Sequence, residues 1–202
     1  MKINFLYKLQ CYLVITLQFF YTYGQNEVSQ GPYEQLILRG ITLINGNGAP
    51  PIGPVDIEIK KNIITKVQVV GYPGVSKKRN GPKLEKNGVE LDYTGMFVLP
   101  GFIDMHGHIG GVSQGADPEY VFNLWMAHGI TTIREPSGRG LNFTLDLKRK
   151  SAKNSIIAPR IYSYTGFGSG AEINNKEDAI KWVRDNAKNG ADGIKFFGAN
   201  PE

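Results

Sequence analysis

Two histidines separated by one glycine end an apolar run of the sequence, Val98-Leu-Pro-Gly-Phe-Ile-Asp-Met-His-Gly-His-Ile109. Side chains alternate between the faces of an extended strand, so His106 and His108 should project together from its C-terminal end. Gly107 between them adds no bulk. Two neutral imidazoles placed in this way can share one divalent cation, for which zinc is the usual choice with nitrogen ligands. Asp104 lies one step earlier on the same face and could orient one of these ligands through a hydrogen bond.

The same run resembles the opening barrel strand of the metal-dependent amidohydrolase superfamily, whose signature at this point is an apolar strand, Pro-Gly and His-x-His. Three further segments carry the resemblance. Leu36-Ile-Leu-Arg-Gly-Ile-Thr-Leu-Ile-Asn-Gly46 resembles the family's first strands, and Asp56-Ile-Glu-Ile-Lys-Lys-Asn-Ile-Ile-Thr-Lys-Val67 its next hairpin. Gly129-Ile-Thr-Thr-Ile-Arg-Glu-Pro136 resembles its second barrel strand. The resemblance covers residues 34–202 and is closest to the imidazolonepropionase-related and peptidase-like members.

The resemblance also implies a role for Lys195, in Gly190-Ala-Asp-Gly-Ile-Lys-Phe-Phe-Gly198. In the two-metal branch of the family, a lysine at the end of strand four is carboxylated by CO2 and bridges both ions as part of the catalytic centre. A carbamate turns a cationic side chain into an anionic oxygen donor. The resemblance therefore implies one or two divalent ions, Zn2+ first, held by His106, His108 and a carboxylated Lys195. The alternative is a lysine that only extends from the strand end into solvent.

Other polar residues near the predicted strand ends are weaker candidates. Arg134 and Glu135 close the second barrel strand, and Arg134 could bind a substrate carboxylate in a bidentate manner, with a structural salt bridge as the alternative. His128 precedes a glycine at a predicted helix end, which favours an interaction with the helix dipole over metal binding. The segment Gly166-Phe-Gly-Ser-Gly-Ala171 matches a dinucleotide fingerprint formally, but the next predicted helix begins too late for that function.

For the enzyme, the resemblance implies a metal-dependent hydrolase that acts on carbon–nitrogen bonds other than typical peptide bonds, through a metal-bound hydroxide. The expected substrate is a small-molecule amide or a dipeptide-like compound. Two alternatives stay open. One is a secreted Xaa-dipeptidase-like metallopeptidase, and the other is a non-catalytic binding module or inactive fragment that keeps the fold. The full-length enzyme could form homo-oligomers.

Composition excludes several other functions. The chain is 41% hydrophobic and 20% charged, as is typical of a globular protein. A formal net charge of +5, to which Lys2 and Lys8 of the leader contribute, is too small to indicate a nucleic-acid partner. Cys11 is the only cysteine and also lies in the leader. Disulfides, a cysteine nucleophile and a thiolate metal site are therefore excluded from the mature protein.

Residues 1–24 are predicted to be a signal peptide. Two lysines precede an apolar stretch that is too short to span a bilayer comfortably, and small residues allow cleavage after Gly24. An uncleaved membrane anchor is the alternative. We therefore expect a secreted or periplasmic protein without stable membrane insertion after cleavage.

The elements that must position these residues follow two patterns. Three β-rich segments separated by turn residues predict part of a small antiparallel β-sandwich: Leu36–Asn45, Val55–Val70 and Val89–Pro100. After residue 100, strands alternate with helices. The expected strands are Gly101–His108, Ile130–Arg134, Arg160–Tyr164 and Gly193–Phe197, and the expected helices are Pro118–His128, about Phe143–Lys153 and Lys176–Asn189. This alternation predicts parallel strands, and the fold class is α/β, the first half of a (β/α)8 TIM barrel preceded by part of a β-sandwich.

A complete barrel of this kind has eight strands, and this chain supplies four. The family also expects a histidine from each of strands five and six and an aspartate from strand eight, which have no counterpart here. We therefore expect a fragment of a longer enzyme with a signal peptide (residues 1–24), a sandwich part (34–100) and four β/α units (101–202). We also expect the isolated chain to be poorly stable and inactive, because it leaves a sheet edge unpaired.

Overall fold

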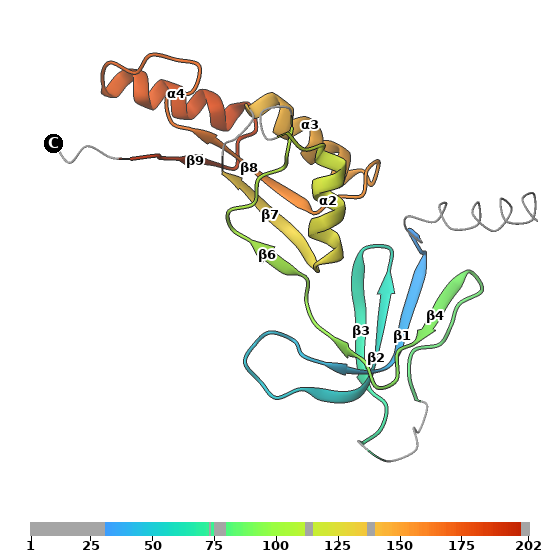
Figure 1. Cartoon of the computed structure of the whole chain (residues 1–202). Coiled ribbons are helices and arrows are strands. Elements are labelled where there is room, and N and C mark those ends of the chain that lie inside the picture. The colour runs from blue at the N-terminus through green and yellow to red at the C-terminus, as the bar shows by residue number, and fades with distance from the viewer. Residues whose placement is uncertain (1–30, 73, 75–79, 112–114, 137–139, 199–202) are drawn as a thin grey trace, which may run out of the picture. The chain divides into compact units, whose positions relative to one another are not determined.

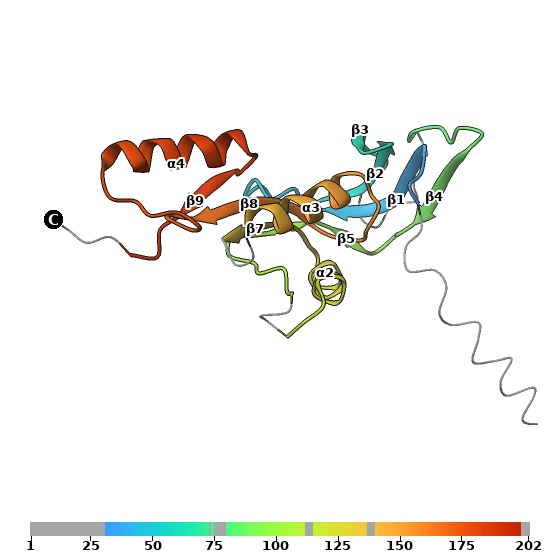
Figure 2. The ribbon, with the colours of Figure 1, turned by 90° about the horizontal axis from the view of Figure 1, so that it is seen from above.

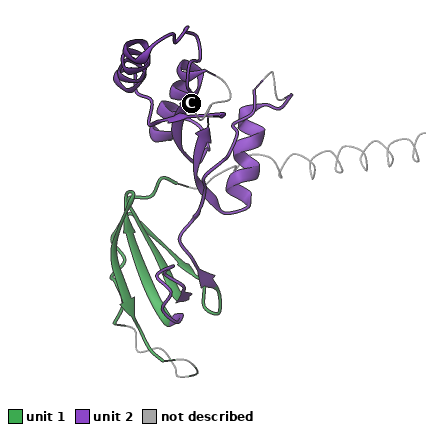
Figure 3. Ribbon diagram, turned by 90° about the vertical axis from the view of Figure 1, so that its left-hand side faces the viewer, with its two compact units in different colours: residues 1–41, 53–96 green, residues 42–52, 97–202 purple. Residues whose placement is uncertain are grey.

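A computed structural model of the chain describes residues 31–72, 74, 80–111, 115–136 and 140–198. The chain divides into two compact units, the first formed by residues 1–41 and 53–96 and the second by residues 42–52 and 97–202 (Figure 3). The predicted signal peptide lies outside the described residues. Among the helices that are described, none combines the length and the apolar character needed to cross a bilayer.

The first unit is built on a mixed β-sheet with the strand order β3-β2-β1-β4 (Figure 1). Its strands are β1 (Gln35–Leu43), β2 (Ile52–Lys60), β3 (Ile63–Val69) and β4 (Gly88–Asp92). The hairpin of β2 and β3 is antiparallel, but β1 pairs with β4 in parallel, and the end of β1 pairs in parallel with β5 (Phe97–Val98). The predicted antiparallel arrangement is therefore wrong for β4 and β5. The connection between β3 and β4 is long enough for β4 to run parallel to β1, whereas a short hairpin loop would make consecutive strands antiparallel.

Alternating apolar residues give this sheet one buried face. Ile37, Ile41, Val55 and Ile57 are almost completely buried. Asp56, between Val55 and Ile57 on β2, is also buried, although alternation points its side chain to the other face. Its carboxylate accepts hydrogen bonds from the Arg39 guanidinium at 2.8 Å and from the Gly40 amide at 2.9 Å. Its two oxygens are thus both satisfied, as burial of a charge requires.

The second unit contains a parallel sheet with the strand order β6-β7-β8-β9 (Figure 1). Strands and helices alternate along the chain as predicted. The elements are β6 (Phe102–Asp104), α2 (Pro118–Ala127), β7 (Ile130–Pro136), α3 (Leu141–Ala152), β8 (Arg160–Gly166), α4 (Lys176–Lys188) and β9 (Gly193–Lys195). The predicted order and type of each element are confirmed, with shifts of a few residues at their ends.

The largest error concerns the first barrel strand, which was expected to run to His108. Strand β6 ends at Asp104 because the Asp104 carboxylate accepts a 2.7 Å hydrogen bond from the His106 amide and turns the chain. Aspartate side chains compete with strand pairing in this way by binding the backbone two residues on. The two histidines therefore lie on the loop that follows β6 and not within the strand. Likewise, β9 ends at Lys195 and does not reach Phe197.

A hydrophobic cluster joins the sheet of this unit to its helices. Its buried members are Ile109, Phe122, Ile133 and Ile161, with partly buried side chains such as Trp125 packed against them. Helix α2 begins after Asp117, whose carboxylate accepts from the Glu119 amide. These contacts fix the loop that carries the histidines against α2 and β7.

Helix α4 lies alongside β8 and β9 in both views (Figure 1 and Figure 2). It begins at Lys176, as predicted, and Asn175 is its N-cap. The Trp182 ring packs 5.4 Å from the Phe167 ring, and its Nε1 donates to the Ser169 carbonyl at 3.3 Å. The glycine-rich segment after β8 therefore forms a turn held by α4 and does not open a helix, which agrees with the exclusion of a dinucleotide site.

Candidate metal centre

The carboxyl ends of β6, β7, β8 and β9 lie at the same edge of the parallel sheet. His106 and His108 follow β6, Arg134 and Glu135 are near the end of β7, and Lys195 is the last residue of β9. In (β/α)8 barrels this edge carries the reactive groups. Arg134 and Lys195 lie at the strand ends where they were expected, whereas His106 and His108 lie on the loop after β6 and not within the strand.

The two imidazoles are neighbours in space. The ring centroids of His106 and His108 lie 5.3 Å apart, with an angle of 75° between the ring planes. Asp104 helps to place them through the backbone, since it binds the amide of His106 and not either ring. The Gly107 amide donates a 3.0 Å hydrogen bond to the Arg134 carbonyl and so attaches the histidine loop to β7.

Gly107 is required by packing at this position. A Cβ atom on Gly107 would lie 3.3 Å from Cβ and Cγ2 of Ile133 and 3.3 Å from Cζ2 of Trp125. Such distances are shorter than ordinary van der Waals contacts, so a side chain would push the loop away from β7 and α2. The glycine thus lets the loop approach the hydrophobic cluster while the histidines on either side remain accessible.

A buried carboxylate holds the second histidine. Glu135 is fully buried, and its Oε1 lies 3.2 Å from Nδ1 of His108. Its Oε2 accepts a 3.0 Å hydrogen bond from the amide of Ile109. The His108 side chain remains 40% exposed, so the ring is held on its Nδ1 side and open to solvent elsewhere.

Arg134 lies on the opposite face of β7 from Glu135. Glu135 shares a face with Ile133, which belongs to the hydrophobic cluster next to α2, because side chains two apart in a strand point the same way. Arg134 Nε donates a 2.6 Å hydrogen bond to the Met105 carbonyl, and its guanidinium carbon lies 5.2 Å from the centroid of the Tyr164 ring. A substrate carboxylate would therefore have to bind the terminal Nη groups, because Nε is already engaged.

Lys195 ends β9, the outer strand on the far side of the sheet from β6. Its Nζ lies 5.6 Å from the centroid of the Phe197 ring, and its carbonyl accepts a 2.8 Å hydrogen bond from the Phe167 amide. Strands β6 and β9 are separated by β7 and β8, so their backbones are about 14 Å apart at about 4.8 Å per strand. The structure brings the two histidines together and leaves the ammonium of Lys195 beside Phe197.

The donor set fits part of a metal site. Zinc takes nitrogen from histidine readily and is usually four-coordinate. His106 and His108 could supply two ligands, and the buried carboxylate behind His108 is the kind of partner that metal-binding histidines usually have. Within the described ranges, no group of three or more His, Cys, Asp or Glu residues is close enough to hold an ion by itself. A complete site therefore requires further donors.

Comparisons with known proteins find relatives over part of their length. Adenine deaminase from Ligilactobacillus salivarius (strain UCC118) is 34% identical over 105 residues, which are 46% of this chain and 18% of that protein. A solved structure of a prolidase from Bifidobacterium longum, which its description calls putative, shares the fold with a TM-score of 0.61 and 23% identity, over 84% of this chain and 42% of that one. A prolidase complexed with N-methylphosphonate-L-proline gives a TM-score of 0.57 and 17% identity, over 80% and 46% of the two chains. No protein-family model matches the chain.

These similarities indicate the metal-dependent amidohydrolase superfamily over part of the chain. The predicted α/β fold class with the first half of a (β/α)8 barrel is confirmed. The chain spans about half the length of the solved amidohydrolase structures and about a fifth of the curated relative. The assignments of His106, His108, Lys195, Arg134 and Asp104 to roles in the site stay predictions.

Glu135 was named at the end of the second barrel strand, but the sequence assigned it no role. The sequence shows that Glu135 and Ile133 share a strand face, and a carboxylate on the apolar face of a strand is unusual enough to indicate a specific partner. The partner itself could not be identified, because β6 and β7 have an irregular register at Phe102 and Ile103. That irregularity decides which residue of β7 lies beside His108.

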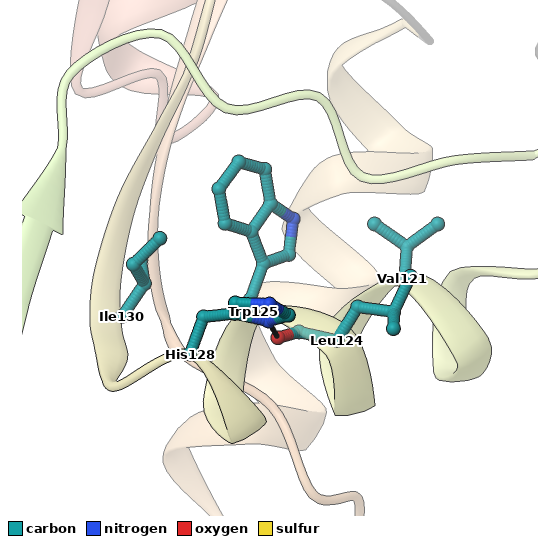
Figure 4. A pocket seen from close by; sticks show the side chains of 5 residues that line it. All are labelled: Val121, Leu124, Trp125, His128 and Ile130. Carbon is teal, nitrogen blue, oxygen red and sulfur yellow. Dashed lines mark hydrogen bonds between the residues drawn. The ribbon is translucent and has the colours of Figure 1, made fainter.

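A pocket of about 410 Å³ lies elsewhere in the same unit (Figure 4). It is lined by Val121, Leu124, Trp125, His128 and Ile130. As predicted, His128 caps the end of α2, where its Nδ1 donates to the Leu124 carbonyl at 2.7 Å. Ile130 begins β7, roughly 17 Å along the strand from Glu135 at about 3.3 Å per residue. Trp125, however, also packs behind Gly107, so the pocket extends from the start of β7 towards the inner side of the histidine loop.

Proposed function

We propose that this chain supplies the first metal-binding histidines of a metal-dependent hydrolase that acts on carbon–nitrogen bonds. The observation that carries the proposal is the pair of adjacent imidazoles at the carboxyl edge of the sheet, one of them held by a buried glutamate. The similarity to an adenine deaminase supports hydrolysis of a carbon–nitrogen bond. A divalent ion held there would polarise a carbonyl or ring carbon–nitrogen bond and acidify an attacking water.

A zinc titration of the purified chain tests this proposal, with a chromophoric chelator as competitor. Loss of a residue that only hydrogen-bonds to a metal ligand weakens metal binding roughly 10–100-fold. His106→Ala and His108→Ala would each remove a ligand itself and should weaken zinc binding by more than this. His128→Ala is the matched control, because it removes the remaining histidine of the chain, which caps α2. Equal zinc affinity in all three variants would contradict the proposal.

We extend the proposal to Lys195, which would react with CO2 once a divalent ion is present. Its neutral Nζ amine would add to the carbon of CO2 and release one proton, leaving an anionic N-carboxylate. Solution 13C NMR after incubation with labelled bicarbonate and Zn2+ should reveal a carbamate resonance in the wild-type chain. That resonance should be absent in Lys195→Ala and retained in Lys188→Ala, which changes an exposed lysine of α4. A resonance retained in Lys195→Ala would remove this residue from the site.

Among carbon–nitrogen substrates, a dipeptide-like compound is the specific candidate. The Nη groups of Arg134 are suited to a free carboxylate, and two of the solved structures that share this fold are described as prolidases. The zinc-loaded chain should bind an Xaa-Pro dipeptide more tightly than the same dipeptide with an amidated C-terminus. Arg134→Gln should remove that difference. Equal binding of the two forms by the wild-type chain would favour a neutral amide substrate.

We also propose that the protein is exported, on the basis of the predicted signal peptide in residues 1–24. Expression of the whole sequence in a host with a secretory pathway should yield a mature chain that begins after Gly24. N-terminal sequencing of the exported and cell-associated fractions measures this directly. A chain that keeps Met1 and remains with the membrane would indicate an anchor.

A further inference from the structure

We propose that Glu135 is a positioning residue that holds His108 with the proton on Nδ1, so that its Nε2 lone pair faces the shared cation. The inference rests on the proposed function, because it concerns the same two histidines. Glu135 would not touch the metal or the substrate. It would act through the imidazole of His108.

The first argument is the chemistry of the contact. A carboxylate in its ionised form has no proton to donate, and in that form the ring nitrogen 3.2 Å from Oε1 is the donor. With the proton on Nδ1, the neutral ring has its free electron pair on Nε2. A histidine can bind a metal only through a nitrogen with a free pair, so the contact selects which atom of His108 is available.

The second argument is rigidity. The two oxygens of Glu135 bind two consecutive residues, the ring of His108 and the amide of Ile109. Ile109 is fully buried in the hydrophobic cluster, and the Glu135 side chain is fully buried as well. The ring and its backbone are thus fixed to the same carboxylate, which preserves the angle at which the imidazole faces its neighbour, His106.

The third argument is the charge of the buried glutamate. Among the residues that the structure describes, its carboxylate contacts the His108 ring and the Ile109 amide. Arg134 is its neighbour in sequence, but the Arg134 side chain binds the Met105 carbonyl. A buried carboxylate without a permanently charged partner is costly. A divalent cation on the far side of the imidazole would supply the missing positive charge through His108.

Long-range 15N–1H NMR of the chain labelled on histidine tests the inference directly. The spectra report which ring nitrogen of each histidine carries the proton, and His106→Ala and His128→Ala assign the signals. We expect His108 to be protonated on Nδ1 before metal is added, and zinc to shift its Nε2 signal. A His108 ring protonated on Nε2 and not on Nδ1 would overturn the inference, since Glu135 would then be a neutral acid that donates to Nδ1.

The variant that tests the role of the carboxylate is Glu135→Gln, which keeps size and removes charge. It should convert His108 to a mixture of the two neutral ring forms and weaken zinc binding by about 10–100-fold. Glu172→Gln removes one exposed negative charge from the same unit and should change neither measurement. Unchanged ring protonation and zinc affinity in Glu135→Gln would overturn the inference. If this variant fails to fold, the wild-type spectrum alone still decides it.

The failure of this inference and of the proposed function can be distinguished. If the wild-type chain does not bind zinc but His108 is protonated on Nδ1 only while Glu135 is present, the positioning role stands and the metal function fails. If zinc binds and needs both histidines but not Glu135, the metal function stands and the positioning role fails.

Discussion

Arg134 on β7 donates a 2.6 Å hydrogen bond from Nε to the carbonyl of Met105, the residue before His106. The Arg134 carbonyl in turn accepts from the amide of Gly107. The end of β7 therefore holds the histidine loop on both sides of His106. This gives Arg134 a structural role in addition to the proposed contact with substrate.

The two roles of Arg134 can be separated by Arg134→Lys. Lysine keeps the positive charge but has no planar guanidinium group. It therefore cannot bind the Met105 carbonyl and also lie beside the Tyr164 ring as arginine does. If the arginine holds the loop, zinc affinity should fall several-fold together with dipeptide affinity. Zinc titration and dipeptide titration of the same samples measure this. Arg160→Lys, at the opposite end of the sheet, is the control, and a loss of dipeptide affinity alone would limit Arg134 to the substrate.

Adding one methyl group at Gly107 should displace the histidine pair, because the methyl group would lie on the side of the loop that packs against the hydrophobic cluster. The new Cβ would be 3.3 Å from Ile133 and Trp125, so the loop must move outward or the cluster must rearrange. Overpacking of this kind costs about 1–3 kcal/mol. We expect Gly107→Ala to lower the urea midpoint followed by tryptophan fluorescence and to weaken zinc binding.

Gly198→Ala is the control for Gly107→Ala, because nothing lies within 4 Å of a Cβ at that position. It should leave both the urea midpoint and zinc affinity at their wild-type values. A Gly107→Ala chain with wild-type zinc affinity would mean that the loop is free to move without separating the two rings. The packing would then have no part in forming the site.

An aromatic ring next to β9 gives a further prediction about the proposed lysine site. A Cβ on Gly193 would lie 2.2 Å from Cε1 of Tyr164, the ring beside the Arg134 guanidinium. Gly193→Ala should therefore displace Tyr164 or separate β9 from β8, since a rigid ring cannot give way by that amount. We expect a lower urea midpoint and, with labelled CO2, a weaker carbamate signal from Lys195. A wild-type signal would show that the register of β8 and β9 survives the change.

The sequence predicts the barrel half of the fold well because periodicity is local. Each strand and helix of residues 101–195 has its own apolar pattern, and helices α2 and α4 have their own side-chain caps, Asp117 and Asn175. Strand β6 is the exception, because a single hydrogen bond from the His106 amide to Asp104 ends the strand early. The pattern of apolar residues continues through that turn and gives no sign of it.

The parts that sequence reasoning could not predict depend on contacts between distant segments. The parallel pairing of β4 with β1 joins residues about fifty positions apart, and no local pattern encodes its direction. The contact of Glu135 with His108 depends on the register between β6 and β7. For Lys195, the resemblance indicates a bridging role, whereas the structure places its Nζ beside Phe197.

Stability of the first unit should depend on pH through Glu58. Hydrogen bonds from Thr65 at 2.7 Å and from Gln35 at 2.6 Å hold the pKa of Glu58 below its ordinary value of about 4.3. As pH falls, the unfolded chain takes up this proton first. The stabilisation is therefore complete above about pH 4.3 and disappears as pH falls through the lower pKa of the folded state. In Glu58→Gln this pH-dependent part should be absent.

Urea unfolding followed by circular dichroism at several pH values between about 3 and 6 measures this effect, a range that covers the ordinary glutamate pKa. Both tryptophans, Trp125 and Trp182, belong to the second unit, so their fluorescence provides an internal comparison in the same sample. Glu58→Gln should reduce the pH dependence of the circular dichroism midpoint and leave that of the fluorescence midpoint as in the wild type. The exposed Glu172→Gln, in the second unit, should leave the circular dichroism behaviour of the first unit unchanged. If the wild-type chain and Glu58→Gln lose stability equally as pH falls, then the hydrogen bonds from Thr65 and Gln35 do not favour the charged form of Glu58.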